Sequence, residues 1–120
     1  MNPSTKPDTG VTVDVEVSNN DQPADGTSQI TVTVTVCVNG VPYPNVPVYL
    51  ELLQSQDARF SNGSTKTMTR TQTGDGGTVK GQTPPIPFTD TTAEMGLVYA
   101  HVNFGDGVGE QKPFRFVKVN

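Results

Sequence analysis

Residues 25–40 read DGTSQITVTVTVCVNG and alternate apolar with polar side chains at a strict period of two over 30–38. Successive side chains of a β-strand point to opposite faces of the sheet, so this pattern predicts a strand with one buried face. Burying a valine or isoleucine contributes roughly 1.5–3 kcal/mol to stability. We therefore expect this strand to be central to the core, with these side chains facing inward: Ile30, Val32, Val34, Val36 and Val38.

The same alternation recurs in other segments and predicts further strands. Phe60 stands in an otherwise polar segment and is expected to close one end of the core. Pro47 has no backbone N–H, so it should lie at a strand end or on an unpaired edge. The other expected strands span residues 11–18, 46–53, 65–73, 97–104 and 111–119, with a short strand from Phe88 that precedes a turn at 93–96.

Glycine and proline mark the connections between these strands. The chain has 12 glycines and 10 prolines, a content that suits short strands joined by tight turns. Residues 74–87 are expected to form a long loop with a short hairpin at 78–82, and residues 105–110 a glycine turn. No segment carries a helical repeat. About seven strands in one small chain predict an all-β fold, a two-sheet antiparallel sandwich.

The length of 120 residues allows one independently folding domain and is too short for two ordinary ones. Residues 1–10 hold two prolines and one glycine without an apolar pattern, so we expect them to be a flexible N-terminal linker. The sandwich domain is expected to span residues 11–120.

The charge of the chain argues against two classes of partner. Its formal net charge is −4 at pH 7, and its 8 lysines and arginines are spread singly. Nucleic acids and anionic membranes bind cationic surfaces, so neither is an expected partner. No apolar run approaches the roughly 20 residues needed to cross a bilayer, so direct membrane insertion is not expected. The amino end lacks the apolar core of a signal peptide, which leaves a cytosolic protein or a piece of a longer exported one.

Residue types that carry catalysis or bind metals are scarce. The single histidine, His101, and the single cysteine, Cys37, lie in different expected strands, so we predict no catalytic residues, no zinc site and no cofactor. Cys37 is expected to be a half-covered sheet residue, with intermolecular pairing as the alternative. Calcium could use turn aspartates, although aspartate before glycine is also ordinary turn chemistry. The turn aspartates in question are Asp25, Asp75 and Asp106.

Three stretches of the chain together resemble the bacterial immunoglobulin-like (Ig-like) domains repeated in the invasin and intimin adhesins. In those domains an A-D-G stretch opens a Thr/Val strand, an N-G-x-P stretch makes the next turn and strand, and a T-D stretch precedes another alternating strand. The resemblance covers roughly residues 11–119. The matching residues are Ala24, Asp25 and Gly26; Asn39, Gly40, Pro42, Asn45, Val46 and Val48; and Thr89, Asp90, Thr91, Gly96, Val98, Ala100 and Val102.

The resemblance implies an Ig-like sandwich that serves as one module of an exported bacterial adhesin at the cell surface. Its expected role is that of a rigid stalk spacer or a protein-contact domain in cell adhesion. Its expected partners are neighbouring Ig-like domains of a longer chain and a protein receptor on a host cell or on the bacterial surface. The family pattern carries no active-site residues, so we do not expect an enzyme.

One outer face of the expected sandwich is richer in contact residues than the rest. If the strand order is that of an immunoglobulin domain, strands 46–53 and 97–104 are neighbours and their outward side chains share a face. Tyrosine supplies a large contact area at low entropic cost, so we predict a protein-contact face there. Its residues are Tyr49, Glu51, Leu97, Tyr99 and His101.

Two further readings of the surface remain open at this stage. The loop around residues 78–86 is a second candidate contact region, because loop residues there are expected to vary without cost to the core. A carbohydrate-binding module is the alternative function, since the same architecture serves that task. Sugar binding normally requires exposed aromatic platforms, and the chain offers three tyrosines and no tryptophan.

Overall fold

The computed structural model describes residues 10–103 and 108–119. Ten strands and one single-turn 3-10 helix account for its regular structure, and no helix among the described residues is long and apolar enough to cross a membrane. Residues 1–9 of the expected linker, Phe104 and Asp106 lie outside the described residues. The elements are β1 (Val11–Ser18), β2 (Gln22–Pro23), β3 (Ile30–Val38), β4 (Val41–Pro42), β5 (Pro47–Leu53), β6 (Arg59–Phe60), β7 (Lys66–Arg70), η1 (Asp75–Gly77), β8 (Ile86–Thr89), β9 (Glu94–Val102) and β10 (Val108–Val117).

The strands form two sheets packed face to face. Sheet I has the order β1-β3-β8-β6, with β4 also paired to β3, and sheet II has the order β2-β10-β9-β5-β7. All pairings are antiparallel except that of β2 with β10, which is parallel. This is the A-B-E-D and G-F-C-C′ order of an immunoglobulin sandwich. The predicted fold class is therefore confirmed, and seven of the described strands are four residues or longer.

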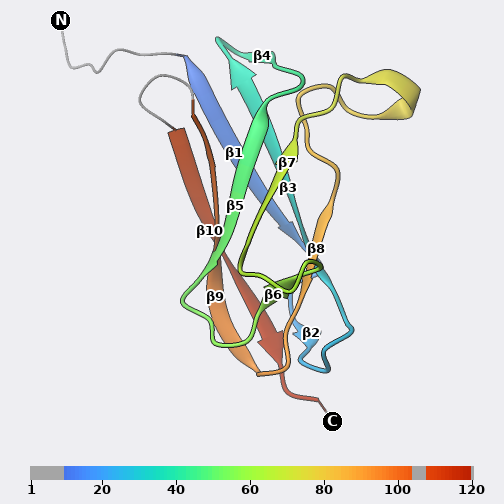
Figure 1. Cartoon of the computed structure of the whole chain (residues 1–120), viewed down its shortest axis with the longest axis vertical. Helices are drawn as coiled ribbons and strands as arrows, with labels where there is room; N and C mark the ends of the chain where they lie inside the picture. Colours follow the sequence, from blue (N-terminus) through green and yellow to red (C-terminus); the bar gives the residue numbers. More distant parts are fainter. Residues whose placement is uncertain (1–9, 104–107, 120) are drawn as a thin grey trace, which may run out of the picture.

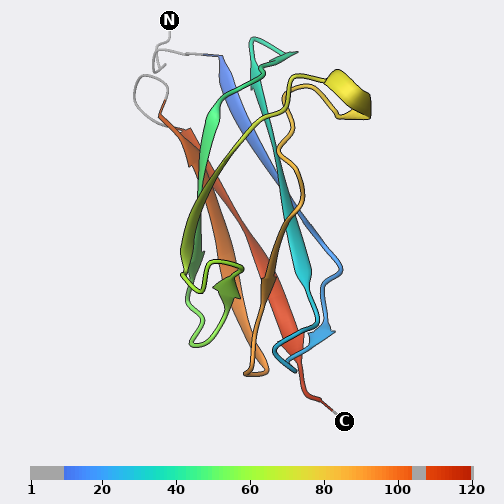
Figure 2. The ribbon, with the colours of Figure 1, turned by 45° about the vertical axis from the view of Figure 1, so that its right-hand side comes forward.

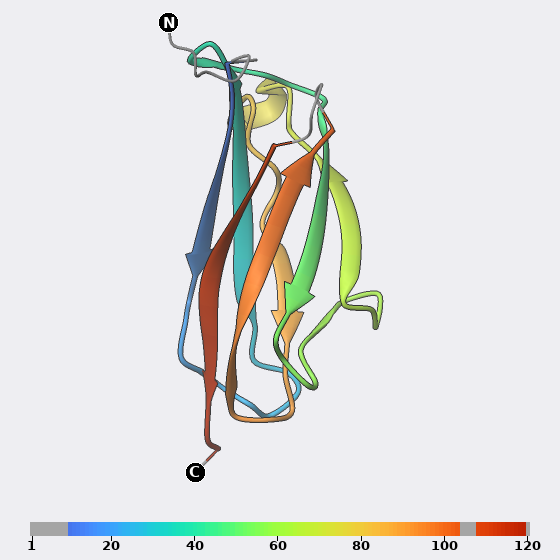
Figure 3. The same cartoon turned by 90° about the vertical axis from the view of Figure 1, so that its left-hand side faces the viewer.

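The strands run between two poles of the molecule. Figure 3 shows sheet II face-on, with β10, β9, β5 and β7 side by side in that order and sheet I behind them. We call the end where β1 begins the entry pole and the end where β10 finishes the exit pole; they lie at opposite ends of the long axis (Figures 1 and 2). The first strand therefore begins at one pole of the sandwich, and the last strand finishes at the other.

The core lies between the two sheets and is lined as the period-two pattern predicts. From β3, the side chains of Ile30, Val32, Val34 and Val36 are fully buried. The strand also occupies a central position in sheet I, between β1 and β8. From sheet II, the opposing inner face comes from alternate residues of three strands, namely Val48, Leu50 and Leu52, then Val98, Ala100 and Val102, and then Phe114 and Phe116.

Four phenylalanines fill the exit-pole half of the core. Phe88 on β8 is their hub: its ring makes edge-to-face contacts with Phe114 at a centroid distance of 4.9 Å and with Phe60 and Phe116 at 5.9 Å each. Edge-to-face pairs at these distances stabilise a core beyond the area they bury. Phe60 closes this end of the core as predicted, and the short strand β6 holds it there through pairing with β8.

The free edge of β1 lies beside β10 and is covered by a side chain. Glu110 accepts a hydrogen bond at Oε1 from the backbone N–H of Val15 at 2.9 Å. Because β1 pairs with β3 on its other side, this N–H points away from its own sheet. Glu110 therefore satisfies a backbone donor that sheet I leaves unpaired.

Two predicted turns are wrong because glycines stand inside strands. The expected turn at 93–96 lies earlier, at 90–93, and β9 begins at Glu94. The expected glycine turn at 105–110 is wrong over 108–110, since β10 begins at Val108, and its earlier residues lie outside the described ranges. Gly96 and Gly109 serve close approach rather than turning, because an added Cβ would lie 2.6 Å from Phe114 Cζ at residue 96 and 2.7 Å from Tyr99 Oη at residue 109.

The expected hairpin at 78–82 is absent, and the loop packs on β3 instead. Its two ends close on each other through hydrogen bonds from Gly81 N to Gln72 O and from Gln72 N to Gln82 O, both at 2.9 Å. Gly81 O then accepts from Val36 N, and Thr83 N donates to Val34 O. Residues 81–83 thus continue sheet I beyond β8, so they cannot vary freely, while residues 73–80 are exposed.

Gly96→Ala is expected to lower the free energy of unfolding by about 1–3 kcal/mol, because the new Cβ would collide with Phe114 Cζ and also lie 2.9 Å from the carbonyl oxygen of Leu53. Urea denaturation of the two proteins measures this. In a Phe114→Leu background the cost of Gly96→Ala should be smaller, which a double-mutant cycle tests. A stabilising effect of Gly96→Ala, as entropy alone would give, would contradict this account of the core.

Candidate functional site

The five residues of the predicted contact face come together on the outer side of sheet II. β5 and β9 pair antiparallel with Tyr49 opposite His101 and Glu51 opposite Tyr99. Directly opposed residues share a face, so all of these side chains point away from the core. Leu97 lies on the same face one row nearer the exit pole, opposite Leu53. All five predicted residues are half-buried.

The centre of this face is a stack of three rings, which we call the Tyr–His stack (Tyr49, His101 and Tyr99). The His101 ring is stacked against both tyrosine rings, with a centroid distance of 5.3 Å and an interplanar angle of 24° to each. Tyr99 also covers Gly109 on β10, so the stack spans three strands. The rings therefore support one another and stiffen the middle of the face.

Strand β7 adds residues that the sequence did not single out. Its register places Met68 directly opposite Tyr49 and Lys66 opposite Glu51. Met68 is 50% exposed, so it extends the apolar surface of the Tyr–His stack toward the edge of the sheet. Because β7 looks weakly apolar on both faces in the sequence, only its pairing with β5 identifies Met68 as part of this surface. Two shallow hollows of about 80 and 180 Å³ flank Tyr49, one of them lined by Lys66.

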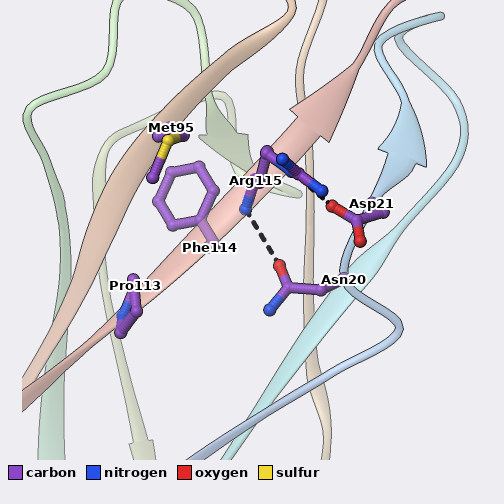
Figure 4. A pocket seen from close by; sticks show the side chains of 6 residues that line it. All are labelled: Asn20, Asp21, Met95, Pro113, Phe114 and Arg115. Atoms are coloured by element: carbon purple, nitrogen blue, oxygen red, sulfur yellow. Dashed lines mark hydrogen bonds and ion pairs between the residues drawn. The ribbon is translucent and has the colours of Figure 1, made fainter.

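A third hollow, of about 230 Å³, lies on the same sheet near the exit pole. Figure 4 shows Arg115 directed at Asp21, with the Asn20 side chain reaching the Arg115 backbone. The Arg115 Nε–Asp21 Oδ1 distance is 2.6 Å, and the hydrogen bond from Arg115 holds the pKa of Asp21 below its ordinary value. Both side chains are more than half exposed, so the pair adds little stability. Met95 and Pro113 complete the apolar lining.

Two of the turn aspartates that could have bound calcium carry out turn chemistry instead. Asp25 accepts hydrogen bonds from the backbone N–H groups of Ser28 at 2.7 Å and Thr27 at 2.9 Å, and these hold its pKa far below the ordinary value. Asp75 accepts from the Thr73 hydroxyl within its own turn. Across residues 10–103 and 108–119, no three histidine, cysteine or acidic side chains are grouped to hold a metal ion.

Cys37 is half-buried on the outer side of sheet I, away from the valine face of β3, as predicted. Its register neighbours are Thr12 on β1 and Pro42 on β4. Pairing with a second chain stays a prediction that this geometry does not test.

The fold is similar to that of Ig-like domains from bacterial adhesins. The D00-D0 domain of intimin is 23% identical with a TM-score of 0.68, over 96% of this chain and 51% of that one. Invasin, described as a bacterial integrin-binding protein, is 24% identical with a TM-score of 0.71, over 89% of this chain and 19% of that one. The adhesin InvE of Yersinia pseudotuberculosis is 18% identical with a TM-score of 0.64, over 90% and 32%.

These similarities establish the fold of the chain, which is that of the intimin and invasin Ig-like domains. The chain spans about half or less of the length of each of these structures. A scan of the sequence finds no matching family model, and no curated protein matches it.

The Tyr–His stack predicts energetic coupling between Tyr49 and His101. A double-mutant cycle with Tyr49→Ala and His101→Ala, measured by urea denaturation, should give a coupling free energy of about 0.5–1 kcal/mol, because the opposed rings are in stacked contact. The matched control is the cycle of Tyr49→Ala with Leu97→Ala, four positions along the sheet, which should be additive. Equal coupling in both cycles would contradict a specific stack.

Proposed function

We propose that this chain is one Ig-like module of a bacterial surface adhesin, exposed outside the cell and joined to further Ig-like domains in a longer protein. The fold it shares with intimin and invasin domains supports this, as does its span of 51% of the two-domain intimin structure. Invasin is described as binding integrins, which are protein receptors, so a protein on a host cell or on the bacterial surface is the proposed partner.

A spacer role is supported by the positions of the first and last strands: β1 begins at the entry pole, and β10 finishes at the exit pole (Figure 1). A module of this kind joins its neighbours end to end and transmits tension along its strands. At the exit pole, backbone hydrogen bonds of 2.9 Å tie Asp21 N to Arg115 O and Ala24 N to Val117 O. The last strand is thus bonded on both sides, to β9 and to residues 21–24, where the chain would leave for the next module.

The outer face of sheet II is the proposed protein-contact face, with the Tyr–His stack at its centre. Large aromatic side chains contribute much of the binding energy in protein interfaces. The outer face of sheet I differs: β1 and β3 present alternating threonines together with Asp14 and Glu16. The face of sheet II instead carries charges of both signs beside the rings: Lys66 and Arg70 on β7, and Glu51 opposite Lys66.

The ring geometry favours a protein partner over a carbohydrate. Sugar-binding platforms need an exposed aromatic face on which a pyranose can lie. In the Tyr–His stack each tyrosine ring is stacked on His101, and both tyrosines are half-buried. The ring surface that His101 leaves uncovered and the hydroxyl groups suit the mixed apolar and polar surface of a protein.

The surface location is tested with an antibody raised against the purified chain. The antibody should label intact bacteria that make the parent protein, and brief protease treatment of the intact cells should remove the label. An antibody against a cytoplasmic protein is the control for cell integrity. Labelling that appears only after the cells are made permeable would contradict an adhesin module.

Binding by the face is tested with the fluorescently labelled chain on cultured mammalian cells, read by flow cytometry. Tyr49→Ala with Tyr99→Ala should weaken binding at least tenfold, because both tyrosines would lose their contact area. The matched control, Thr31→Ala with Thr33→Ala, alters the outer face of sheet I and should leave binding unchanged. If the tyrosine variant binds normally and has the melting temperature of the parent, the proposed contact face is wrong. Only the spacer role then remains.

A further inference from the structure

The turn between β8 and β9 contains the one acidic side chain that is buried among the described residues. Asp90 is only 1% exposed. Its Oδ1 accepts a hydrogen bond from the backbone N–H of Thr92 at 2.9 Å, whereas the buried Oδ2 receives no N–H or hydroxyl donor. Burying an ionised carboxylate oxygen without a hydrogen-bond donor costs free energy of folding. The Asp90 carboxyl group must therefore be stabilised in another way.

The neighbour of this carboxyl group is a second one. Glu94, at the start of β9, lies across the turn at 90–93 from Asp90, and its carboxyl group acts on that of Asp90. Its two oxygens already accept backbone N–H groups, Oε1 from Gln56 at 2.8 Å and Oε2 from Asp57 at 3.0 Å. A carboxylate with two such donors is held in its ionised form. Two adjacent carboxylates, one of them buried, do not both ionise readily, so a proton belongs on Asp90.

We propose that Asp90 and Glu94 share one proton, carried on Asp90 Oδ2 and donated to Glu94, and that this proton latches three loops together at the exit pole. The loops are residues 24–28, 54–58 and 90–94, and we call their meeting point the three-loop junction.

The acid pair sits at the centre of the bonds that hold this junction. The backbone carbonyl of Asp90 accepts from Gly26 N at 2.9 Å, which attaches the first loop. Glu94 attaches the second loop through its two backbone donors. The Thr92 hydroxyl also donates to Asp57 Oδ2. Loss of the shared proton would place two negative charges side by side in this junction and weaken all of these attachments.

Three other charged side chains belong to the elements around the pair. Arg59 on β6 acts on Glu94 through its positive charge and donates hydrogen bonds to the carbonyl groups of Gln56 and Ala58. Asp57, in the second loop, accepts from Thr92. Asp25, in the first loop, directs its carboxylate to its own turn. Arg59 therefore stabilises the charge on Glu94, and none of these groups supplies a donor to Asp90 Oδ2.

The electrostatics give the direction of the pH effect. Burial, followed by the hydrogen bond with Glu94, raises the pKa of Asp90 to about 7. Burial alone would raise the pKa of Glu94 too, but hydrogen bonds from Asp90 and from the backbone of residues 56 and 57 hold it below its ordinary value. Between pH ~4 and ~7 the folded protein therefore keeps a proton on Asp90 that the unfolded chain releases, so stability falls as pH rises through this range.

The frequency with which the three-loop junction opens therefore depends on pH. In mildly acidic surroundings the proton is in place and the three-loop junction is closed. Above neutral pH Asp90 ionises, and the loops open more often.

Amide hydrogen exchange tests the latch. The amides of Gly26, Gln56 and Asp57 report its opening, and their opening constants, corrected for intrinsic exchange, should rise roughly tenfold per pH unit between about pH 5 and 7, since one proton is released. In Asp90→Asn the side-chain N–H₂ donates to Glu94 at every pH, so this dependence should disappear. Glu16→Gln, an exposed acid on β1, is the matched control and should keep it. His101 is present in all three proteins.

Carboxyl ¹³C NMR of the unmodified protein makes the test independent of any variant. The Asp90 resonance should titrate near neutral pH, well above the exposed acids. If Asp90 titrates near pH 4, or if the opening constants of the three amides show the same pH dependence in Asp90→Asn as in the parent, the shared proton is wrong. A loss of the dependence in Glu16→Gln as well would equally overturn it.

Discussion

The burial of one face of β3 is the constraint on which the rest of this structure depends. Ile30, Val32, Val34 and Val36 are fully removed from water, and a strand can bury four such residues only if a second layer covers them. Sheet II supplies that layer. On the sheet itself β3 is bonded to β1 on one side and to β8 on the other, with residues 81–83 extending the β8 side. The poles, the outer faces and the loops all take their positions from this strand.

The two outer faces of the sandwich are unequal, although the inner faces are both apolar. Sheet I presents β-branched hydroxyl side chains with acids, whereas sheet II presents stacked rings beside charged residues of both signs. The difference arises in the polar half of each period-two pattern, which the core leaves unconstrained. Residues there can be selected for contact with other molecules without altering how the sheets pack.

Local sequence patterns predict the strands. They do not predict features that depend on contacts between segments far apart in the sequence. The period-two segments became strands, Pro47 begins β5, and β5 and β9 are neighbours, which brought the contact face together. Gly96 and Gly109 have the sequence surroundings of turn residues, because nothing nearby in sequence shows that Phe114 and Tyr99 lie against them. The ring stacking, the placement of Met68 and the parallel pairing of β2 depend on register between distant segments. The acid pair was missed for the same reason: Asp90 and Glu94 are four residues apart, but only the folded turn buries Asp90.

The hydrogen bond from Val15 to Glu110 has a consequence beyond this single chain. An open strand edge is a template on which another polypeptide can add a strand, and proteins that carry many similar sandwiches in one chain risk pairing between the wrong copies during folding. Glu110 both occupies the exposed donor of β1 and leaves a carboxylate where an intruding strand would have to lie. The contact thus protects the protein against aggregation and strand exchange when copies are crowded together.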